Sequence, residues 1–328
     1  MADGGDRHDA DDVGLKEESI QAKTGDFSNW MSKLPPRLCC EPLKNIAIPG
    51  SHDSFSFYLD DTSEVAAGSP DTVRNLVSVF GATAKKIVHN WSVTQSLTFK
   101  EQLDHGIRYL DLRMSPRAHT SDLFFVHGLF GNTVESGLRE INEWLDAHPK
   151  EVVLIDFNHF YDMSAEDHQI LVLQIQQIFG DKVCPLMDID KSALNVLWDN
   201  KWQVIVFYCH DDTTIDKTQL WPSNCIQSIW PNTTEAPKMV NRLEAYLTRG
   251  RPNDKFYVSQ GVLTPTGTTI LQRISSNLKD VCAPVAMKNL LFFLKNKSIG
   301  PKGINIVIAD FVELDDFVSK VLALNPSE

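Results

Sequence analysis

The 328-residue chain contains few cysteines, and their spacing matches neither a metal site nor a disulfide framework. Its six cysteines form no C-x-x-C pair and no His/Cys ligand pattern. Zinc modules and disulfide-stapled folds depend on such spacings. We therefore interpret the cysteines as structural thiols: Cys39, Cys40, Cys184, Cys209, Cys225 and Cys282.

Positive charge is also scarce. Lysine and arginine number 31 against 43 aspartates and glutamates, which gives a formal net charge of −12. Proteins that bind nucleic acid need clustered lysine and arginine to neutralise phosphates. We therefore expect no nucleic-acid partner.

The sequence lacks long apolar runs and a typical secretion signal. No stretch approaches the ~20 apolar residues needed to span a bilayer. The N-terminus lacks the basic start, apolar stretch and cleavage site of a signal peptide. Residues 1–29 are polar, acidic and nearly free of aromatics, which predicts a disordered tail. We expect a cytoplasmic protein with no transmembrane segment.

The chain does contain short apolar runs that alternate with segments of helical period. The apolar runs predict strands within residues 45–50, 106–115, 123–128, 151–160, 202–210, 255–263 and 304–312. Most are apolar on both faces, as parallel strands covered by helices are. Residues 135–148, 285–296 and 315–325 have the periodicity of covering helices. Two irregular segments, 60–71 and 210–234, are interpreted as long loops.

This alternation predicts an α/β fold with one domain over residues 30–328. A single TIM-type β/α barrel fits nearly 300 residues of alternating strands and helices. A doubly wound open sheet is the alternative. It is disfavoured because no Gly-rich phosphate loop follows the first predicted strand.

Ionisable side chains stand at the carboxyl ends of several predicted strands. In a β/α barrel these ends converge on one mouth. Asp111 and Arg113 are two residues apart on one strand, so both point to the same face. The candidate site consists of His52, Asp53, Asp111, Arg113, His127 and Asp310.

Two histidines that flank an arginine suit the cleavage of a phosphodiester. One neutral imidazole can take a proton from an attacking hydroxyl, and one imidazolium can give a proton to the leaving oxygen. The guanidinium offsets charge on the phosphoryl oxygens. Aspartates bonded to the far ring nitrogens would fix a tautomer and raise a pKa.

Other histidines have weaker signals. His159 and His210 follow predicted strands, where a role in shaping the substrate site and simple packing in the core or a loop are equally open. The motif HDD at residues 210–212 could hold a metal, but no second ligand set supports this.

Several motifs resemble a known family. NIAIPGSHDSFSFY, WSVTQSLTFKEQLDHGIRYLDLR, FFVHGLFG and EVVLIDFNHFY are similar to the X domain of phosphatidylinositol-specific phospholipases C. The similarity is greatest to the short animal X-domain-containing proteins, nearer to members 2 and 3 than to member 1. It runs from about Trp30 to Asn325 and implies a distorted TIM barrel.

The resemblance implies a role for each matched residue. His52 matches the general base that deprotonates the inositol 2-hydroxyl, and Asp310 matches its orienting carboxylate. His127 matches the general acid that protonates the diacylglycerol oxygen, assisted by Asp53 and Asp111. The implied products are diacylglycerol and a cyclic inositol phosphate.

Arg113 bears on the question of a metal. In this family an arginine here contacts the phosphate, whereas the calcium-dependent relatives carry a second carboxylate at this position. Ca²⁺ requires oxygen ligands, and a fixed cation would repel it. We expect no metal cofactor and calcium-independent chemistry.

Substrate contacts are predicted from strand position. We nominate Asn158, Tyr208, Trp230 and Gln260 as residues that bind the inositol ring, although Trp230 could equally pack a loop beside Pro231. A lipid substrate also requires transient contact with a membrane surface. Two segments could supply this contact. The first is an amphipathic helix with Val77, Phe80, Ala84, Lys85 and Lys86, which could equally close the barrel. The second is Leu129 with Phe130.

Three functions remain open. The favoured one is a metal-independent phospholipase C that acts on phosphatidylinositol lipids. The second is a phosphodiesterase for another glycerophosphodiester. The third is a catalytically weak or inactive phosphoinositide-binding protein.

Overall fold

The computed structural model describes residues 26–66, 68–69, 71–210 and 218–327. Most of the predicted N-terminal tail and the two aspartates of the HDD motif lie outside the described residues.

The strands are β1 (Ile48–Ser51), β2 (Tyr109–Pro116), β3 (Leu123–His127), β4 (Leu129–Thr133), β5 (Val153–Phe160), β6 (Val204–Tyr208), β7 (Trp221–Pro222), β8 (Ile226–Ile229), β9 (Phe256–Gln260) and β10 (Ile306–Ala309). The α-helices are α1 (Pro36–Cys39), α2 (Asp71–Ser92), α3 (Phe99–Asp104), α4 (Val134–Ala147), α5 (Ala165–Phe179), α6 (Leu194–Asp199), α7 (Ala236–Arg249), α8 (Gly267–Gln272), α9 (Leu278–Val281), α10 (Ala283–Leu294) and α11 (Phe317–Leu322). The short 3-10 helices are η1 (Met31–Lys33), η2 (Leu43–Asn45), η3 (Gly180–Lys182), η4 (Ile189–Lys191) and η5 (Ser223–Cys225).

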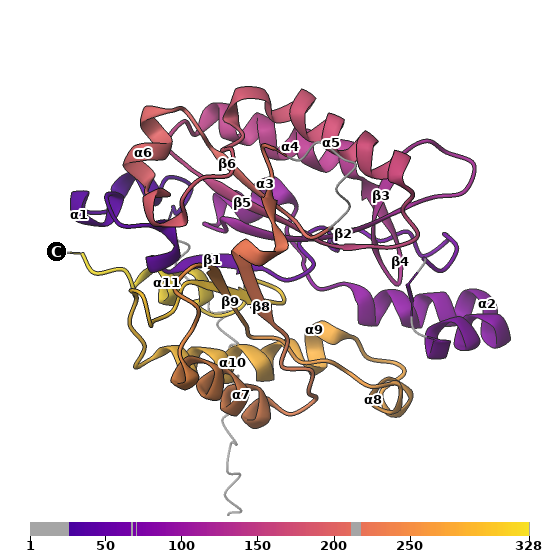
Figure 1. The fold of residues 1–328 in the computed structure, drawn as a ribbon. Coiled ribbons are helices and arrows are strands. Elements are labelled where there is room, and N and C mark those ends of the chain that lie inside the picture. Colours follow the sequence, from indigo (N-terminus) through magenta and orange to yellow (C-terminus); the bar gives the residue numbers. More distant parts are fainter. Residues whose placement is uncertain (1–25, 67, 70, 211–217, 328) are drawn as a thin grey trace, which may run out of the picture.

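The strands form a nearly closed parallel barrel. They follow the order β7-β6-β5-β2-β1-β10-β9-β8, and the neighbours in this order pair in parallel. The two end strands, β7 and β8, are joined along the chain by η5. Helices α4 and α5 cover one side of the barrel, and α7 and α10 cover another (Figure 1). The predicted α/β barrel is confirmed.

The strand predicted at 123–128 is confirmed, but it lies outside the barrel, and one segment predicted to be a loop contains strands. The run at 123–128 forms β3, which is not a barrel strand but part of an antiparallel hairpin with β4. This hairpin forms because β2 is long enough for Met114, Ser115 and Pro116 to pair with β3. The segment 210–234, predicted to be a loop, contains β7 and β8, which are too short to show a strand pattern.

Side chains alternate between the barrel interior and the helical layer. Tyr109, Leu154, Ile205, Phe256 and Ile306 are among the residues packed inside. Leu110, Ile155, Val206 and Val307 pack outward with the covering helices. Gly50 faces the narrow interior, where a Cβ atom would lie 2.9 Å from Ile308 and from Tyr109. Because the interior is filled, functional groups can gather only at the strand ends.

The predicted covering helices pack as their periodicity indicates. In α4, Leu138, Ile141 and Leu145 are all fully buried. In α10, Met287 and Leu290 are buried in the same core. These apolar faces lie against the outer side chains of the barrel strands, which fixes the strand ends in place.

A buried ion pair holds the N-terminal segment on the barrel. Arg108 and Glu151 are both fully buried, and Arg108 Nη2 lies 2.8 Å from Glu151 Oε2. The same nitrogen donates to the carbonyl oxygen of Ser28 at 2.8 Å. Glu151 in turn accepts the backbone N–H of Ser32. Ser28, which the sequence places in the tail, therefore contacts the barrel.

Candidate active site

His52 stands directly after β1, with its backbone and ring both anchored. Its N–H donates to the carbonyl of Ala309 at 3.1 Å, which ties it to the end of β10. Its carbonyl accepts from Gln95 Nε2 at 2.8 Å and from Thr94 Oγ1 at 3.0 Å. The ring nitrogen Nδ1 lies 2.7 Å from Asp310 Oδ1. A carboxylate accepts, so Nδ1 carries the proton and Nε2 faces the mouth.

Asp53 lies at the centre of the charged groups. Its side chain is fully buried, and Oδ1 lies 2.6 Å from Arg113 Nε. Oδ2 lies 3.5 Å from His52 Nε2 and 3.4 Å from His127 Nε2. Neither carboxylate oxygen accepts an aligned hydrogen bond from the described residues. The Asp53 backbone has φ +41°, a conformation that aspartate tolerates better than most residues.

Arg113 bridges the two halves of the site. Its Nη2 lies 3.2 Å from His52 Nε2 and 3.9 Å from Asp111 Oδ2. Asp111 Oδ2 also accepts the backbone N–H of Asp53 at 3.1 Å. The predicted convergence of Asp111 and Arg113 on one face of β2 therefore agrees with the geometry.

His127 reaches the mouth from the β3–β4 hairpin and not from a barrel strand. Its Nδ1 donates to the carbonyl of Ser92, the last residue of α2, at 2.7 Å. This bond turns Nε2 toward Asp53. The His52 and His127 ring centroids are 6.5 Å apart, and their planes are 81° apart. With 28% of its side chain exposed, His127 is more open to solvent than His52, at 13%.

The electrostatics of the free site differ between the two histidines. Burial lowers the pKa of His52, but the neighbouring carboxylates, Asp53 first, outweigh this and raise it to about 9. Burial lowers the pKa of His127 below its usual 6.5, and Arg113 lowers it further, against the opposing effect of Asp53. Burial raises the pKa of Asp53, but Arg113 and the histidines bring it down to about 2. These directions favour the proton of the free site on His52, whereas the Arg113 Nη2 contact at 3.2 Å from His52 Nε2 favours the neutral ring, because a guanidinium only donates.

Comparison with known proteins identifies the family. PI-PLC X domain-containing protein 3 from Mus musculus is 44% identical over 301 residues, covering 91% of this chain and 94% of that protein. PI-PLC X domain-containing protein 2 from the same organism is 42% identical over 300 residues, covering 91% and 87%. PI-PLC X domain-containing protein 1 is 35% identical over 308 residues, covering 93% and 88%. This chain belongs to the PI-PLC X domain-containing protein family.

The resemblance drawn from the motifs is confirmed, including the greater similarity to members 2 and 3. No family model matches the chain.

Solved structures show that this family member has the fold of the bacterial enzymes. A point mutant of the phosphatidylinositol-specific phospholipase C from Staphylococcus aureus matches with a TM-score of 0.64 at 18% identity, over 93% of this chain and 98% of that one. The phosphatidylinositol-specific phospholipase C from Listeria monocytogenes matches with a TM-score of 0.61 at 17% identity, over 92% and 100%. At these identities the likeness concerns the fold.

The nominated ring-binding residues of this family member are spread over different places. Asn158 lies in the site, with Nδ2 2.5 Å from Asp111 Oδ1. Gln260 donates to Ser228 Oγ at 2.8 Å, and the exposed Trp230 donates to Thr264 Oγ1 at 2.9 Å. No contact of Gln260 or Trp230 with the six charged residues is found in the described part of the chain.

Tyr208 does not face the mouth, so its nomination was wrong. It lies on the outward face of β6 with Val204 and Val206, in the core shared with the helices. Its hydroxyl lies 2.7 Å from Nδ1 of His168, on α5. The alternation of side chains along β6 places it there, and the apolar run gave no polar face that could reveal the orientation.

Sequence reasoning missed two residues that support the site, Thr94 and Gln95, and left a third, His159, undecided. Thr94 and Gln95, which hold the His52 carbonyl, belong to the motif WSVTQSL, and their polar side chains between apolar runs were the available signal. His159 stands opposite Arg113 because the pairing of β2 with β5 shifts by one residue at this point. This bulge at Asn158 turns His159 toward the same end of the barrel.

The predicted membrane contacts are only partly exposed. Leu129 and Phe130 are buried, so their prediction as a membrane contact was wrong. Ala84 is fully buried, and Lys85 donates to the carbonyl of Thr62, while Lys86 is exposed. The side chain of Phe80 lies outside the described set. Within that set, no helix is both long and apolar enough to cross a membrane.

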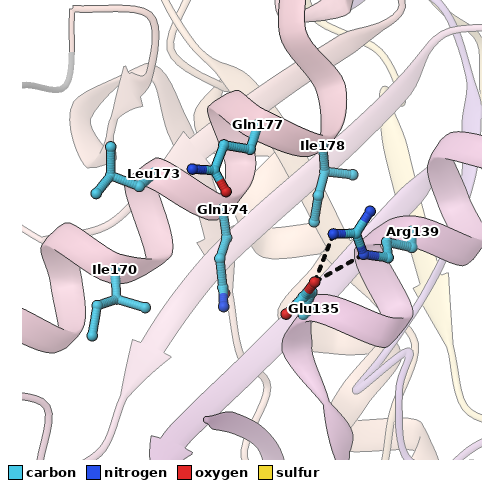
Figure 2. A pocket seen from close by; sticks show the side chains of 7 residues that line it. All are labelled: Glu135, Arg139, Ile170, Leu173, Gln174, Gln177 and Ile178. Atoms are coloured by element: carbon cyan, nitrogen blue, oxygen red, sulfur yellow. Dashed lines mark hydrogen bonds and ion pairs between the residues drawn. The ribbon is translucent and has the colours of Figure 1, made fainter. Parts of the chain in front are cut away.

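A separate groove of about 270 Å³ lies between α4 and α5 (Figure 2). Arg139 and Glu135 form an ion pair there, with Nε and Nη2 of the arginine 2.9 and 2.7 Å from Oε1. The groove is lined by Glu135, Arg139, Ile170, Leu173, Gln174, Gln177 and Ile178. None of the candidate site residues lines it, so it is not part of the active site.

Proposed function

We propose that the chain is a phospholipase C-type phosphodiesterase that cleaves phosphatidylinositol lipids to diacylglycerol and a cyclic inositol phosphate. The observation that carries this proposal is the placement of two anchored imidazoles around one guanidinium and one carboxylate. Their centroids are 6.5 Å apart, with Arg113 and Asp53 between them. The names of the relatives supply the lipid class, and the site supplies the chemistry.

The reaction uses one proton acceptor and one proton donor. His52 Nε2 takes the proton of the inositol 2-hydroxyl, whose oxygen attacks phosphorus and closes the cyclic phosphate. His127 Nε2 gives a proton to the diacylglycerol oxygen as the bond from phosphorus to that oxygen breaks. Arg113 offsets the charge on the phosphoryl oxygens. Asp310 holds the His52 tautomer, which its contact at 2.7 Å supports.

We propose that this reaction needs no calcium. His52, Asp53 and Asp111 bring ligand-type atoms within 4.8 Å of one another, so a cation could in principle gather them. However, Arg113 Nε already lies 2.6 Å from Asp53 Oδ1. A fixed guanidinium offsets the same carboxylates and disfavours a second cation beside it.

Access to the lipid is proposed to occur at the mouth. Trp230 and Leu271 expose 52% and 61% of their surface, and Ile274 exposes 46%. Trp230 follows β8, and α8 follows β9, so both lie on the side of the carboxyl ends of the strands. Apolar side chains there could enter a lipid surface while the headgroup enters the barrel.

The proposal is tested by release of diacylglycerol from phosphatidylinositol vesicles in excess EGTA. The wild type should be active, and His52→Ala should lose about 10²–10⁴-fold in kcat/KM. His105→Ala is the matched control, because His105 ends α3 just before β2, at the opposite end of the barrel. A folded wild type that binds vesicles without turnover would refute the proposal.

A second assay separates the two proton roles. A soluble inositol phosphodiester with a phenol leaving group of low pKa needs little protonation of that group. On this substrate His127→Ala should recover much of its lost rate, whereas His52→Ala should not. Equal losses for both variants on both substrates would contradict the assignment of acid and base.

The pKa shifts of the free site run against the two assigned proton roles. The mechanism needs neutral His52 and protonated His127, the reverse of the free site. In the free site the carboxylates raise the pKa of His52 to about 9 and burial lowers that of His127, so few free molecules carry the productive arrangement. Cleavage of a lipid-free glycerophosphodiester in preference to phosphatidylinositol would instead support the second function class.

A further inference from the structure

The hydrogen bonds that the Asn158 side chain makes beside Arg113 fix the orientation of its amide. Asn158 Nδ2 lies 2.5 Å from Asp111 Oδ1, and a carboxylate oxygen accepts. The same amide also interacts with the buried carboxyl group of Asp156. The NH₂ group therefore points toward the two carboxyl groups, and Oδ1 points the other way.

This orientation determines the tautomer of His159. His159 Nδ1 lies 2.5 Å from Asn158 Oδ1. A carbonyl oxygen only accepts, so Nδ1 must carry the proton, and in the neutral ring Nε2 is then an acceptor. Burial lowers the pKa of His159 and Arg113 lowers it further, which favours this neutral form.

The acceptor lies at the mouth of the barrel. His159 pairs with Arg113 across the β2–β5 bulge. Its side chain is exposed, and its ring lies over Tyr161 with centroids 6.0 Å apart. Among the described residues of β5, β6, β8 and β9, no lysine or arginine stands at the carboxyl end of the strand. A neutral acceptor next to the phosphate-binding arginine is suited to a hydroxyl donor.

We infer that His159 is a specificity-determining residue whose Nε2 accepts a hydrogen bond from a free hydroxyl of the headgroup ring. This inference rests on the proposed function and narrows its substrate class. A phosphate at that ring position offers no hydroxyl proton and places negative charge against the lone pair. The site therefore selects a ring that is unphosphorylated where it meets His159.

Two substitutions separate the two hydrogen bonds of His159. The inner bond runs from Nδ1–H to Asn158, and the outer bond is the proposed one from a headgroup hydroxyl to Nε2. His159→Asn can keep a donor at the Nδ1 position but removes the outer acceptor. His159→Gln can place an amide oxygen near the Nε2 position but loses the inner donor. His159→Asn should raise KM for phosphatidylinositol about fivefold with little change in kcat, as expected for one lost hydrogen bond. His159→Gln should raise KM less, and His105→Asn serves as the remote control.

Discrimination between lipids gives the second readout. The ratio of kcat/KM for phosphatidylinositol to that for its ring-phosphorylated forms should fall in His159→Asn, because the acceptor that selects a hydroxyl is gone. An unchanged KM together with an unchanged ratio would overturn the inference.

A measurement without turnover keeps the inference separate from the proposed function. ¹⁵N NMR of the histidine rings should show the Nδ1–H tautomer at His159, and less of it in Asn158→Ala. Addition of myo-inositol 1-phosphate should shift the Nε2 resonance, and His159→Asn should weaken its binding. An Nε2–H tautomer, or no shift on addition, would overturn the inference. If the wild type fails to cleave any lipid, the proposed function fails, and this titration still decides the role of His159.

Discussion

The contact between Asp310 and His52 makes a measurable prediction about both charge and stability. The rise of the His52 pKa from 6.5 to about 9 corresponds to about 3 kcal/mol. A hydrogen bond to a charged group contributes about 1.5–3 kcal/mol, so Asp310→Asn should lower the His52 pKa to roughly 7–8. Asparagine keeps the size of the side chain at 2.7 Å from Nδ1 and removes only its charge.

The sign of the stability effect follows from the raised pKa. Folded His52 binds its proton more tightly than the unfolded chain does. Its contribution is therefore complete below pH 6.5 and is lost as the pH rises through about 9. The wild type should lose about 3 kcal/mol from this group between these limits, and Asp310→Asn only about 1–2 kcal/mol.

The assay is an NMR pH titration of the His52 ring together with urea unfolding at pH 6.5 and 9.5. Asp316→Asn, which makes the same charge change at an exposed carboxylate, is the control. The comparison between variants cancels the other groups that titrate in this range. A wild-type His52 that titrates near 6.5, or one that Asp310→Asn leaves at about 9, would refute the electrostatic reasoning.

Four further predictions concern single residues. Arg113→Asp should reduce kcat/KM in EGTA by about 10²–10³-fold, the usual cost of one transition-state donor, and should bind calcium, which isothermal titration would detect. Asp53→Asn should lower the free energy of unfolding by about 3 kcal/mol because a buried pair is broken, and Asp53→Ala by about 1 kcal/mol more because φ is +41°, both measured in urea. Burial raises the pKa of Asp156 to about 7, so its contribution to stability falls as the pH rises from 3.8 to 7, and Asp156→Asn should remove about 4 kcal/mol of that pH dependence. Glu151→Gln should cost about 3–5 kcal/mol in thermal or urea unfolding because Arg108 would stay buried without its counter-charge; a loss below 1 kcal/mol would show that water reaches this pair.

The sequence predicted the barrel because its main strands contain runs of β-branched and other apolar residues and their covering helices are strongly periodic. Residues 151–160 and 304–312 contain the apolar runs 152–155 and 306–309, and both segments form barrel strands. The elements that were missed have only two to five residues. Trp221–Pro222 and Ile226–Ile229 depend on neighbouring strands for their pairing, and no local pattern encodes such a neighbour.

The candidate site was predictable where chemistry alone identifies a residue. His52, Asp111 and Asp310 were nominated together because ionisable groups at the carboxyl ends of barrel strands converge on one mouth, and His52 lies 4.0 Å from Asp111 and 2.7 Å from Asp310. Tyr208 was misplaced because a strand buried on both faces does not reveal which side chains point inward. His159 was left undecided because its orientation depends on a one-residue shift in pairing, which is a property of two strands together.

The proposed reaction needs neutral His52 and protonated His127, whereas the pKa shifts of the free site favour the opposite. The charge balance of the site bears on this difference. With His52 protonated and His127 neutral, two cations, His52 and Arg113, face the three carboxylates Asp53, Asp111 and Asp310. A phosphodiester anion entering this site would leave it more negative still, unless a proton were taken up. His127 is the neutral base nearest the gap, with Nε2 3.4 Å from Asp53 Oδ2. Added negative charge raises the pKa of a neighbouring imidazole, so His127 would take up a proton from solvent as the substrate binds. Protonated His127, the acid of the proposed reaction, would then form only when the substrate is bound. The free site does not have to keep His127 protonated.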